Sequence, residues 1–238
     1  MPNSTFHFKE FTVEQDRCAM KVGTDGVLLG AWTAISKDVN SILDIGSGTG
    51  LIALQLAQRS GAEVIDAIEI EAGAFEQAVE NFENSEWADR LYCYHASLQE
   101  FVDEIDEKYD LIVSNPPFYN DTFKKLDEKR ALARHTNELT FEDLLHGIKK
   151  ILSDHGTANV IIPFKEESKF LEVARLKQLF PSKISRYSGH KDADLKRSMI
   201  ELNHKESNVK EESFFLEHSR HEYSEHYKNL VKDFYLKL

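Results

Sequence analysis

Short apolar runs alternate with longer amphipathic stretches through the first half of the chain. Each apolar run is as long as a strand, whereas the stretches between them repeat apolar positions every three or four residues, as a helix with one buried face does. The strand-like runs are 42–45, 64–70, 91–95 and 111–114, and the helical stretches are 51–59 and 72–84. This alternation predicts a parallel sheet with helices on both of its faces, and therefore an α/β fold.

The second half of the chain continues this alternation less regularly. Thr140 and Asp143 form the pattern of a helix cap and first turn, and the helix that they open is expected to run to Ile151. After it the pattern predicts strands at 157–162, 183–188 and 199–202, a helix at 165–179 and a polar connection at 204–212. Apolar residues at helical spacing in the last stretch predict a docked C-terminal helix over about 221–238.

No repeat, low-complexity tract or flexible linker divides the chain of 238 residues, so we expect a single domain over 1–238. The longest apolar runs are too short to cross a bilayer, and the first residues lack the features of a secretory signal. We therefore expect a cytoplasmic protein with no membrane partner, and we expect a monomer. In a reducing compartment Cys18 and Cys93 are expected to be free thiols. The ten histidines show no metal-ligand spacing, and no metal is expected.

The formal net charge of −12 opposes non-specific binding to nucleic acids, so any such role depends on a local basic surface. Two groups of basic residues are candidates for that surface. The first is Lys124, Lys125, Lys129, Arg130 and Arg134, and the second is Lys183, Arg186, Lys191, Lys196 and Arg197. Either group can flank a binding site and meet phosphates, or it can be a solvated face that neighbouring acids balance.

A glycine-rich segment, Asp44-Ile45-Gly46-Ser47-Gly48-Thr49-Gly50, follows the first predicted strand of the alternating region and opens a predicted helix. In an open α/β sheet this position forms a ligand-binding crevice, and glycines let the backbone approach the ligand closely. A nicotinamide dinucleotide site needs a third glycine where the chain has Leu51, and a phosphate-binding loop needs a Lys-Ser/Thr pair that is absent. The segment therefore favours a nucleoside without phosphates.

Glu69, on the next predicted strand, completes the pattern of a site for S-adenosylmethionine. This cofactor offers a carboxylate for the exposed amides at the helix start and a ribose diol for an acid on the next strand. Glu69 follows the glycines by about twenty residues, the separation at which an acid meets ribose hydroxyls in related dinucleotide folds. The alternative is that the glycines form a structural turn and that Glu69 is a solvated acid.

The motif Asn115-Pro116-Pro117-Phe118 directly follows the strand that ends at Ser114. Consecutive prolines hold the backbone rigid at the carboxyl end of the strand, the edge at which the cofactor crevice is expected. The Asn115 side-chain oxygen and the Pro116 carbonyl can accept both hydrogens of an amino group, which makes its lone pair available, and Phe118 can stack on a planar substrate. The alternative is a tight turn with Phe118 in the core. Neither cysteine lies in a comparable turn, which disfavours covalent methylation of a pyrimidine carbon.

With these motifs the chain resembles the class I S-adenosylmethionine-dependent methyltransferases that act on amino nitrogen. Its segment Phe11–Trp32 is similar to the N-terminal segment of the tRNA(Val) adenine-N6 methyltransferases, which modify adenine 37, just 3′ of the anticodon. The resemblance covers nearly the whole chain and includes Ala133–His135, Lys196-Arg197 and Asp233–Tyr235. It implies a Rossmann-like sheet of seven mostly parallel strands, the last of them antiparallel.

By this resemblance an N-terminal segment over about residues 1–40 covers the cofactor. The residues expected to bind it are Lys21, Thr24, Asp25, Asp44, Gly46, Gly48, Gly50, Glu69, Ser97 and Asn115. Asp25 is expected at the amino-acid end of the cofactor. Such enzymes often have an acid after the third strand to hold the adenine amino group, whereas this chain has Ser97, which accepts a weaker hydrogen bond.

The reaction that the resemblance implies is methylation of adenine N6 in tRNA. Asn115, Pro116 and Phe118 are the expected catalytic residues, and the residues expected to meet tRNA are Pro117, Tyr119, Lys124, Lys125, Arg134, Lys196 and Arg197. Methylation of a protein glutamine or of guanine N2 in ribosomal RNA stays open, because the same turn serves all planar nitrogens. A nucleic-acid-binding module that has lost transfer is a further alternative, which the intact Asn115 disfavours, and Leu51 disfavours a dehydrogenase.

Overall fold

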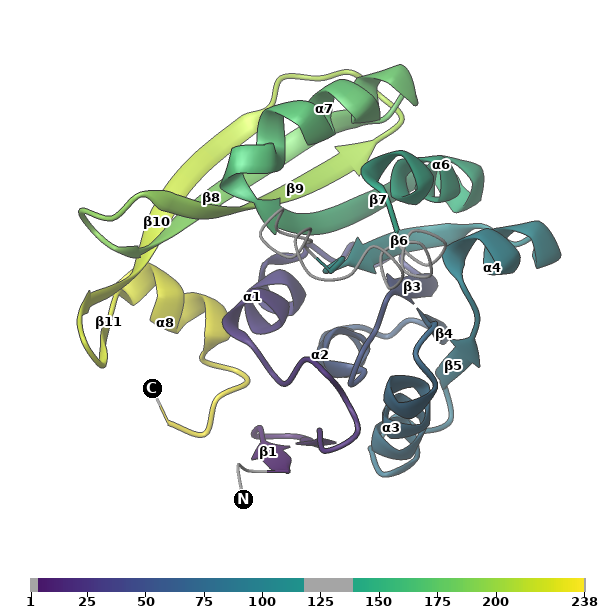
Figure 1. Ribbon diagram of the computed structural model, residues 1–238, viewed down its shortest axis with the longest axis horizontal. Helices are drawn as coiled ribbons and strands as arrows, with labels where there is room; N and C mark the ends of the chain where they lie inside the picture. Colours follow the sequence, from purple (N-terminus) through teal and green to yellow (C-terminus); the bar gives the residue numbers. More distant parts are fainter. Residues whose placement is uncertain (1–3, 118–138, 238) are drawn as a thin grey trace, which may run out of the picture.

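A computed structural model of the chain describes residues 4–117 and 139–237. Within them, nine strands form one central sheet with helices on both of its faces (Figure 1). A separate two-stranded sheet near the N-terminus pairs β1 (Thr5–His7) with β2 (Thr12–Glu14). In spatial order the central strands are β11 (Glu222–Tyr223), β10 (Lys210–Ser219), β8 (Phe180–His190), β9 (Leu195–Asn203), β7 (Leu152–Pro163), β6 (Tyr109–Ser114), β3 (Ser41–Ile45), β4 (Val64–Glu69) and β5 (Leu91–His95).

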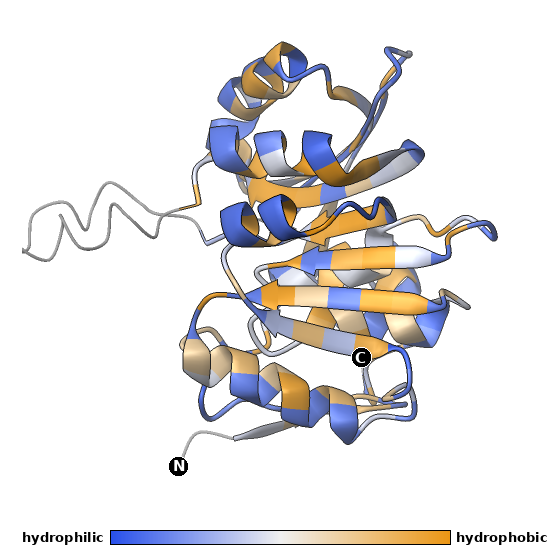
Figure 2. Ribbon diagram, turned by 90° about the vertical axis from the view of Figure 1, so that its right-hand side faces the viewer, coloured by the Kyte–Doolittle hydropathy of each residue, from blue (hydrophilic) through white to orange (hydrophobic). Residues whose placement is uncertain are grey.

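Each face of the sheet is covered by its own group of helices (Figure 1). One group is α1 (Thr24–Trp32), α2 (Leu51–Arg59), α3 (Ala72–Glu83) and α8 (Glu225–Val231). The other is α4 (Leu98–Glu104), α6 (Phe141–Ile151) and α7 (Glu167–Leu176), which the 3₁₀ turn η2 (Phe164–Glu166) precedes. Successive residues of a strand enter opposite cores, so that Ile42 packs in the first core and Leu43 in the second. Because both faces are covered, the central strands are largely hydrophobic (Figure 2).

The seven adjacent strands from β5 to β8 have the topology that the resemblance implies. Strands β3, β4, β5, β6 and β7 are parallel, and β9 pairs antiparallel with both β7 and β8. The expected strand count is wrong, because β10 pairs parallel with β8 and β11 pairs antiparallel with β10. The end of the expected polar connection at 204–212 starts β10. This strand lies near the edge of the sheet, and most of its residues are polar and exposed, so its sequence lacks the apolar run of a central strand.

The expected C-terminal helix over 221–238 is also wrong in its extent, since α8 spans Glu225–Val231. After α8 the chain turns toward the N-terminal strands. Phe234 is buried there, and its carbonyl accepts a hydrogen bond from the backbone N–H of Lys9 at 2.9 Å. Tyr235 forms an isolated bridge with Phe8. The described apolar residues at helical spacing are therefore mostly buried, but Phe234 lies against the N-terminal segment instead of extending a helix. None of the helices formed by the described residues is long and apolar enough to cross a membrane.

Candidate active site

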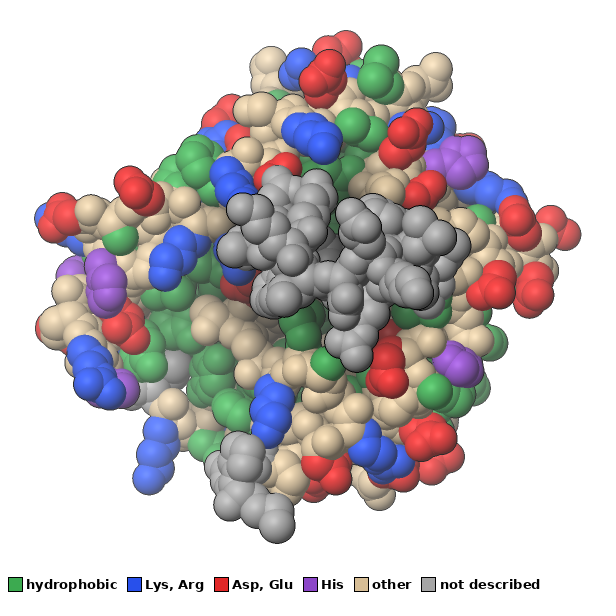
Figure 3. All heavy atoms as spheres, viewed as in Figure 1, with side chains coloured by type: hydrophobic (Ala, Val, Ile, Leu, Met, Phe, Trp, Pro, Cys, Tyr) green, Lys and Arg blue, Asp and Glu red, His purple; other side chains and the backbone are tan. Residues whose placement is uncertain are grey.

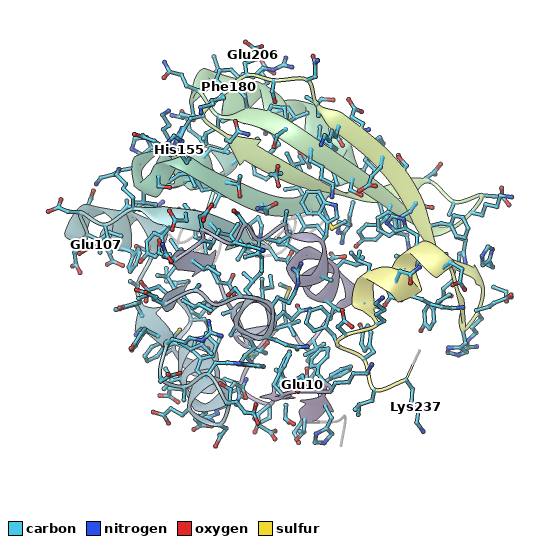
Figure 4. The ribbon with its side chains drawn as sticks, turned by 180° about the vertical axis from the view of Figure 1, so that it is seen from behind. Glu10, Glu107, His155, Phe180, Glu206 and Lys237 are labelled. Atoms are coloured by element: carbon cyan, nitrogen blue, oxygen red, sulfur yellow. The ribbon has the colours of Figure 1, made fainter. Side chains whose placement is uncertain are left out.

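A cavity of about 730 Å³ opens at the carboxyl ends of β3, β4, β5 and β6. The strand order reverses here, because the chain continues from β3 through β4 to β5 on one side and from β6 to β7 on the other. Ligands of open α/β sheets bind at such reversals, and the volume suits a nucleoside with an amino-acid substituent. Figure 4 shows the molecule from behind. Its labels Glu107, just before β6, and Phe180, the first residue of β8, mark the amino ends of these strands, opposite the rim that holds the cavity.

The three glycines of the glycine-rich segment have different roles. All three have positive φ, of 72° at Gly46, 56° at Gly48 and 79° at Gly50. A Cβ atom at Gly46 or Gly48 would meet nothing within 4 Å, and both residues line the cavity. A Cβ atom at Gly50 would lie 2.4 Å from Cε1 of Phe82, so Gly50 is required where α2 packs against α3. The backbone is thus open toward the cavity at Gly46 and Gly48, and the predicted contact of Gly50 with the cofactor stays a prediction.

Asp44 lies beneath this segment and is fully buried. Its Oδ2 accepts a hydrogen bond from the backbone N–H of Ala53 at 3.2 Å, whereas Oδ1 has no hydrogen-bond partner within residues 4–117 and 139–237. Burial away from solvent raises the pKa of this carboxyl to about 7. Asp44 is not among the residues that line the cavity, so its predicted contact with the cofactor stays a prediction, but a buried acceptor without a partner fits an ammonium or amide group.

Glu69 ends β4 and joins that strand to the glycine-rich segment. Its Oε2 accepts a hydrogen bond from the backbone N–H of Gly48 at 2.8 Å, and its Oε1 accepts one from Glu71 N–H at 2.9 Å. The carboxylate is half-buried and lines the cavity one strand away from Gly46. Glu69 therefore lies beside the cavity at the end of the strand next to β3, and its predicted contact with a ribose diol stays a prediction.

Asn115 and Pro117 line the same cavity from the end of β6, and Pro116 is buried behind them. Strands β3 and β6 are paired with Ile45 opposite Ser114, and the Ser114 hydroxyl donates to the Ile45 carbonyl at 2.9 Å. The two strands thus end level with each other. The central prediction from the sequence, that the glycine-rich segment and the Asn-Pro-Pro turn share one rim of one sheet, is confirmed.

Several predicted site residues lie outside the described residues, and their roles stay predictions. These are Phe118, Tyr119, Lys124, Lys125 and Arg134.

The segment before α1 covers the cavity through different residues from those expected. Cys18, Ala19 and Met20 line the cavity, whereas Lys21 and Thr24 are not among its lining residues. Backbone and side-chain hydrogen bonds tie the segment to α3, for example from Arg17 N–H to Gln77 Oε1 at 3.1 Å. The resemblance implied the residues that follow, and the apolar character of Ala19 and Met20 gave no sign of a ligand contact.

Asp25, expected at the amino-acid end of the cofactor, is hydrogen bonded inside the protein. Its Oδ1 accepts from the Tyr187 hydroxyl, and its Oδ2 forms an ion pair with Arg197 Nε at 2.7 Å. Burial and the Asp25 charge raise the pKa of Tyr187, so its hydroxyl remains a donor. These contacts join the start of α1 to β8 and β9. Any contact of Asp25 with the cofactor stays a prediction.

The two cysteines are free thiols, as expected. Cys93 lies 4.0 Å from the Ser47 hydroxyl beside the glycine-rich segment. Burial raises the pKa of Cys18 to about 11 and that of Cys93 to about 12. Both side chains are therefore protonated at neutral pH, which agrees with a site that forms no covalent intermediate through cysteine.

Comparison with known proteins assigns the chain to a family. The family model of the methyltransferase small domain matches residues 25–171. A protein of Christiangramia forsetii named tRNA1(Val) (adenine(37)-N6)-methyltransferase is 55% identical, with 100% of each chain covered. A protein of Flavobacterium psychrophilum with the same name is 52% identical, over 98% of this chain and 100% of its own. The chain belongs to this methyltransferase family.

The fold comparison agrees with the assignment. The solved structure of a predicted O-methyltransferase from Agrobacterium tumefaciens matches with a TM-score of 0.68 at 17% identity, over 88% of this chain and 96% of that chain. At this level of identity the match concerns the fold alone. It supports the α/β fold that the alternation of apolar and amphipathic stretches predicted and the Rossmann-like sheet that the resemblance implied.

Two helix starts contribute residues to the methyltransferase site that the sequence did not assign to it. Thr140 caps α6, as predicted, by accepting from Asp143 N–H at 3.1 Å, and both residues line the cavity. Ser97, a predicted cofactor residue, also lines the cavity and caps α4. Gln99 and Glu100 follow it into the cavity wall. The sequence signal for Glu100 was the Ser-x-x-Glu spacing of a capping box. That spacing is fully explained by helix capping and therefore does not indicate a ligand contact.

The structure divides the second group of basic residues. Lys183 lies over the Trp32 ring and within 3.5 Å of Glu212, and Arg186 is bound by Glu167 and Glu211. These two cations of β8 contact residues of α1, α7 and β10. Lys191, Lys196 and Arg197 instead lie at the carboxyl end of β8 and the start of β9, beside the rim that holds the cavity.

Figure 3 shows one face of the methyltransferase, on which acidic side chains lie among the basic ones. Several Lys and Arg side chains lie above and to the left of the residues drawn in grey, and Asp and Glu side chains predominate on the right. Arg197 is paired with Asp25, so Lys191 and Lys196 carry the charge that is least compensated in this group. Within the described ranges, no cluster of three or more His, Cys, Asp or Glu residues has the arrangement of a metal site.

Proposed function

We propose that this methyltransferase transfers the methyl group of S-adenosylmethionine to N6 of adenine 37 in tRNA(Val). The observation that carries the proposal is the register of β3 and β6, which sets the glycine-rich segment and Asn115 side by side on one rim. The choice of substrate is supported by full-length relatives that are named tRNA1(Val) (adenine(37)-N6)-methyltransferases. We place the protein in the cytoplasm, where tRNA is found, and propose that it acts as a monomer.

The residues around the cavity fit this cofactor. When bound, S-adenosylmethionine supplies a methyl group on a positively charged sulfur. Glu69 would hold the ribose diol, and the open backbone at Gly46 and Gly48 would lie against the ligand. The free Oδ1 of Asp44 would accept from the ammonium group or from a water bound to it. Each of these groups lies on the strand end that its role requires.

Asn115 and Pro116 would prepare the target amino group for attack. The Asn115 side-chain oxygen and the Pro116 carbonyl accept its two N–H groups, which turns the nitrogen lone pair toward the methyl donor. In the transfer the nitrogen would form its bond to the methyl carbon as the bond from that carbon to sulfur breaks, and the methylated nitrogen would then release one proton to solvent. An amide side chain is not a base, so Asn115 contributes orientation and hydrogen bonding, and positioning supplies most of the acceleration. Phe118 remains the proposed stacking partner of the base.

Adenine N6 is favoured over the two other planar nitrogens that the Asn-Pro-Pro turn can serve. The side-chain amide of a protein glutamine and the N2 amino group of guanine could bind to Asn115 equally well. The relatives that match the whole chain carry the adenine name, and the match includes the segment before α1 that covers the cavity. A non-catalytic binding module is disfavoured by the intact Asn115 and by the open glycine backbone.

The proposal is tested with labelled S-adenosylmethionine and two transcripts of tRNA(Val), one with adenine and one with guanine at position 37. We expect label in N6-methyladenosine with the first transcript and none with the second. Label in guanosine, or in co-purified protein, would transfer the activity to one of the alternatives. A wild-type enzyme that binds the cofactor but labels neither transcript would contradict the choice of tRNA.

A further inference from the structure

An acidic residue, Glu100, lines the part of the pocket where the adenine base of the cofactor would lie. It follows Ser97 by three residues. Strands β4 and β5 are paired with Glu69 opposite His95, and the Ala96 N–H donates to the Glu69 carbonyl at 3.2 Å. The residues that follow β5 therefore lie one strand beyond the ribose acid, on the side away from Asn115. A nucleoside whose ribose binds Glu69 and whose sulfur faces Asn115 extends its base toward this end. The flat base would lie between the side chains of Ile70 and Leu98, which both line the pocket.

Ser97 holds the first position after β5 that can offer a side-chain acceptor, but its hydroxyl is already committed. It donates to Glu100 Oε2 at 2.7 Å and accepts from Glu100 N–H at 3.2 Å. The Ser97 backbone N–H donates to the same Oε2 at 2.9 Å. A hydroxyl has one hydrogen and two lone pairs, so Ser97 has no hydrogen left to donate and keeps one acceptor position, which is weaker than that of an ionised carboxylate.

The same contacts fold the Glu100 side chain back over Ser97. Its carboxylate therefore occupies the space beside Ser97 and lines the pocket. All three contacts of the capping box involve Oε2 or the backbone, and Oε1 has no hydrogen bond to the described part of the chain. The hydrogen bonds from Ser97 also lower the pKa of Glu100, so the free oxygen belongs to an ionised carboxylate.

We infer that Glu100 binds the exocyclic amino group of the cofactor adenine through Oε1, with Ser97 as the residue that positions it. This inference rests on the proposed function, since it takes S-adenosylmethionine to be the ligand of the pocket. An ionised carboxylate accepts the N6 hydrogen of adenine and repels a carbonyl oxygen at the same ring position. The Ser-x-x-Glu capping box thus makes the site selective for adenine over hypoxanthine.

The test compares two ligands that differ at this ring position. S-adenosylhomocysteine carries the amino group, and S-inosylhomocysteine carries a carbonyl instead. Titration calorimetry of the whole protein measures both affinities without any methyl transfer. For the wild type we expect tighter binding of the adenine ligand by about 100-fold.

Glu100→Gln is the decisive variant, because glutamine also supports a capping box. Its amide oxygen is expected to take over the bonds from Ser97, which leaves the NH₂ group facing the base. The adenine ligand should then bind about 10-fold more weakly and the inosine ligand more tightly, so that the preference falls below about 3-fold. Because the preference is a ratio within one protein, a general loss of stability does not change it.

Glu104→Gln is the matched control, because it makes the same change on the same exposed helix without touching the pocket. It is expected to keep the wild-type preference. Asp143→Asn tests the other acid near the base, at the start of α6. An unchanged preference in Glu100→Gln overturns the inference, as does a preference that is lost only in Asp143→Asn. A wild type that binds neither ligand would instead contradict the proposed function.

Discussion

The Asp44 side chain is fully buried, so its carboxylate is not solvated when it is ionised. Burial raises its pKa from 3.8 to about 7 in the folded protein. The folded state therefore binds this proton more tightly than the unfolded chain does. Below about pH 4 the carboxyl is protonated in both states and costs nothing, and stability is lost as the pH rises from about 4 to about 7. The ligand-free protein is thus expected to be less stable at pH 8 than at pH 5 through this residue.

Asp44→Asn is predicted to remove this dependence. Between pH 5 and pH 8 the free energy of unfolding of the wild type should fall by about 2 kcal/mol more than that of the variant. Urea unfolding at both pH values measures the difference, and contributions of other titrating groups cancel in it. Parallel pH profiles of the two proteins would show that the Asp44 pKa is not raised.

Asn115→Ala tests the residue that meets the amino group. We expect turnover to fall by about 1,000-fold, because an acceptor for the reacting nitrogen is removed, while the affinity for S-adenosylhomocysteine changes by no more than a few-fold. Single-turnover methyl transfer and titration calorimetry give the two numbers. Comparable losses in both measurements would mean that Asn115 supports the fold of the turn and not the reaction.

At the scale of elements, the site depends on how closely α2 packs against α3. Gly50 stands at the start of α2 with a φ of 79°. Alanine there would be strained by the backbone and would meet the ring of Phe82. The third glycine of the motif is therefore required by the packing of two helices, whereas the first two face the cavity.

Gly50→Ala is accordingly predicted to destabilise the protein by about 2–4 kcal/mol. Chemical unfolding measures the loss, and the double variant Gly50→Ala, Phe82→Leu should recover part of it by removing the clash. Gly61→Ala is the control, because a Cβ atom there meets nothing within 4 Å and φ is not positive. Equal effects at the two glycines would rule out the packing explanation.

At the scale of the whole molecule, a chain with a net charge of −12 must bind a polyanion through a limited surface. Several basic side chains lie on the face shown in Figure 3, with acidic side chains among them. Lys191 and Lys196 have no ion pair within the described residues, and they lie two to three strands from β6. A tRNA whose anticodon loop enters the site would meet them with its backbone phosphates.

The variant Lys191→Ala, Lys196→Ala is predicted to weaken tRNA binding by about 10-fold near physiological salt. The slope of log affinity against log salt concentration should become shallower by about 1 to 2, because each phosphate that the variant no longer neutralises keeps its counterion. Affinity for S-adenosylhomocysteine should not change. Lys205→Ala, Lys210→Ala is the control at the opposite edge of the sheet, near Glu206 in Figure 4, and is expected to keep the wild-type slope.

The sequence alone determined the features that depend on neighbours along the chain. Alternation of apolar and amphipathic stretches predicted α2, α3, α6 and the parallel strands, because the period of burial is a local property. The order of the glycines, Glu69 and Asn115 at successive strand ends predicted the shared rim, because parallel strands all end at the same edge.

Only the tertiary structure decided which side chain meets which partner across the fold. It paired Asp25 with Tyr187 and Arg197, more than 150 residues away in sequence, and it placed Phe82 against Gly50. It also added β10 to the sheet, although little of that strand is apolar, and it placed Glu100, a member of the α4 capping box, in the wall of the pocket. These contacts depend on long-range packing and on the pairing of edge strands. Neither produces a periodic pattern of apolar residues in the sequence.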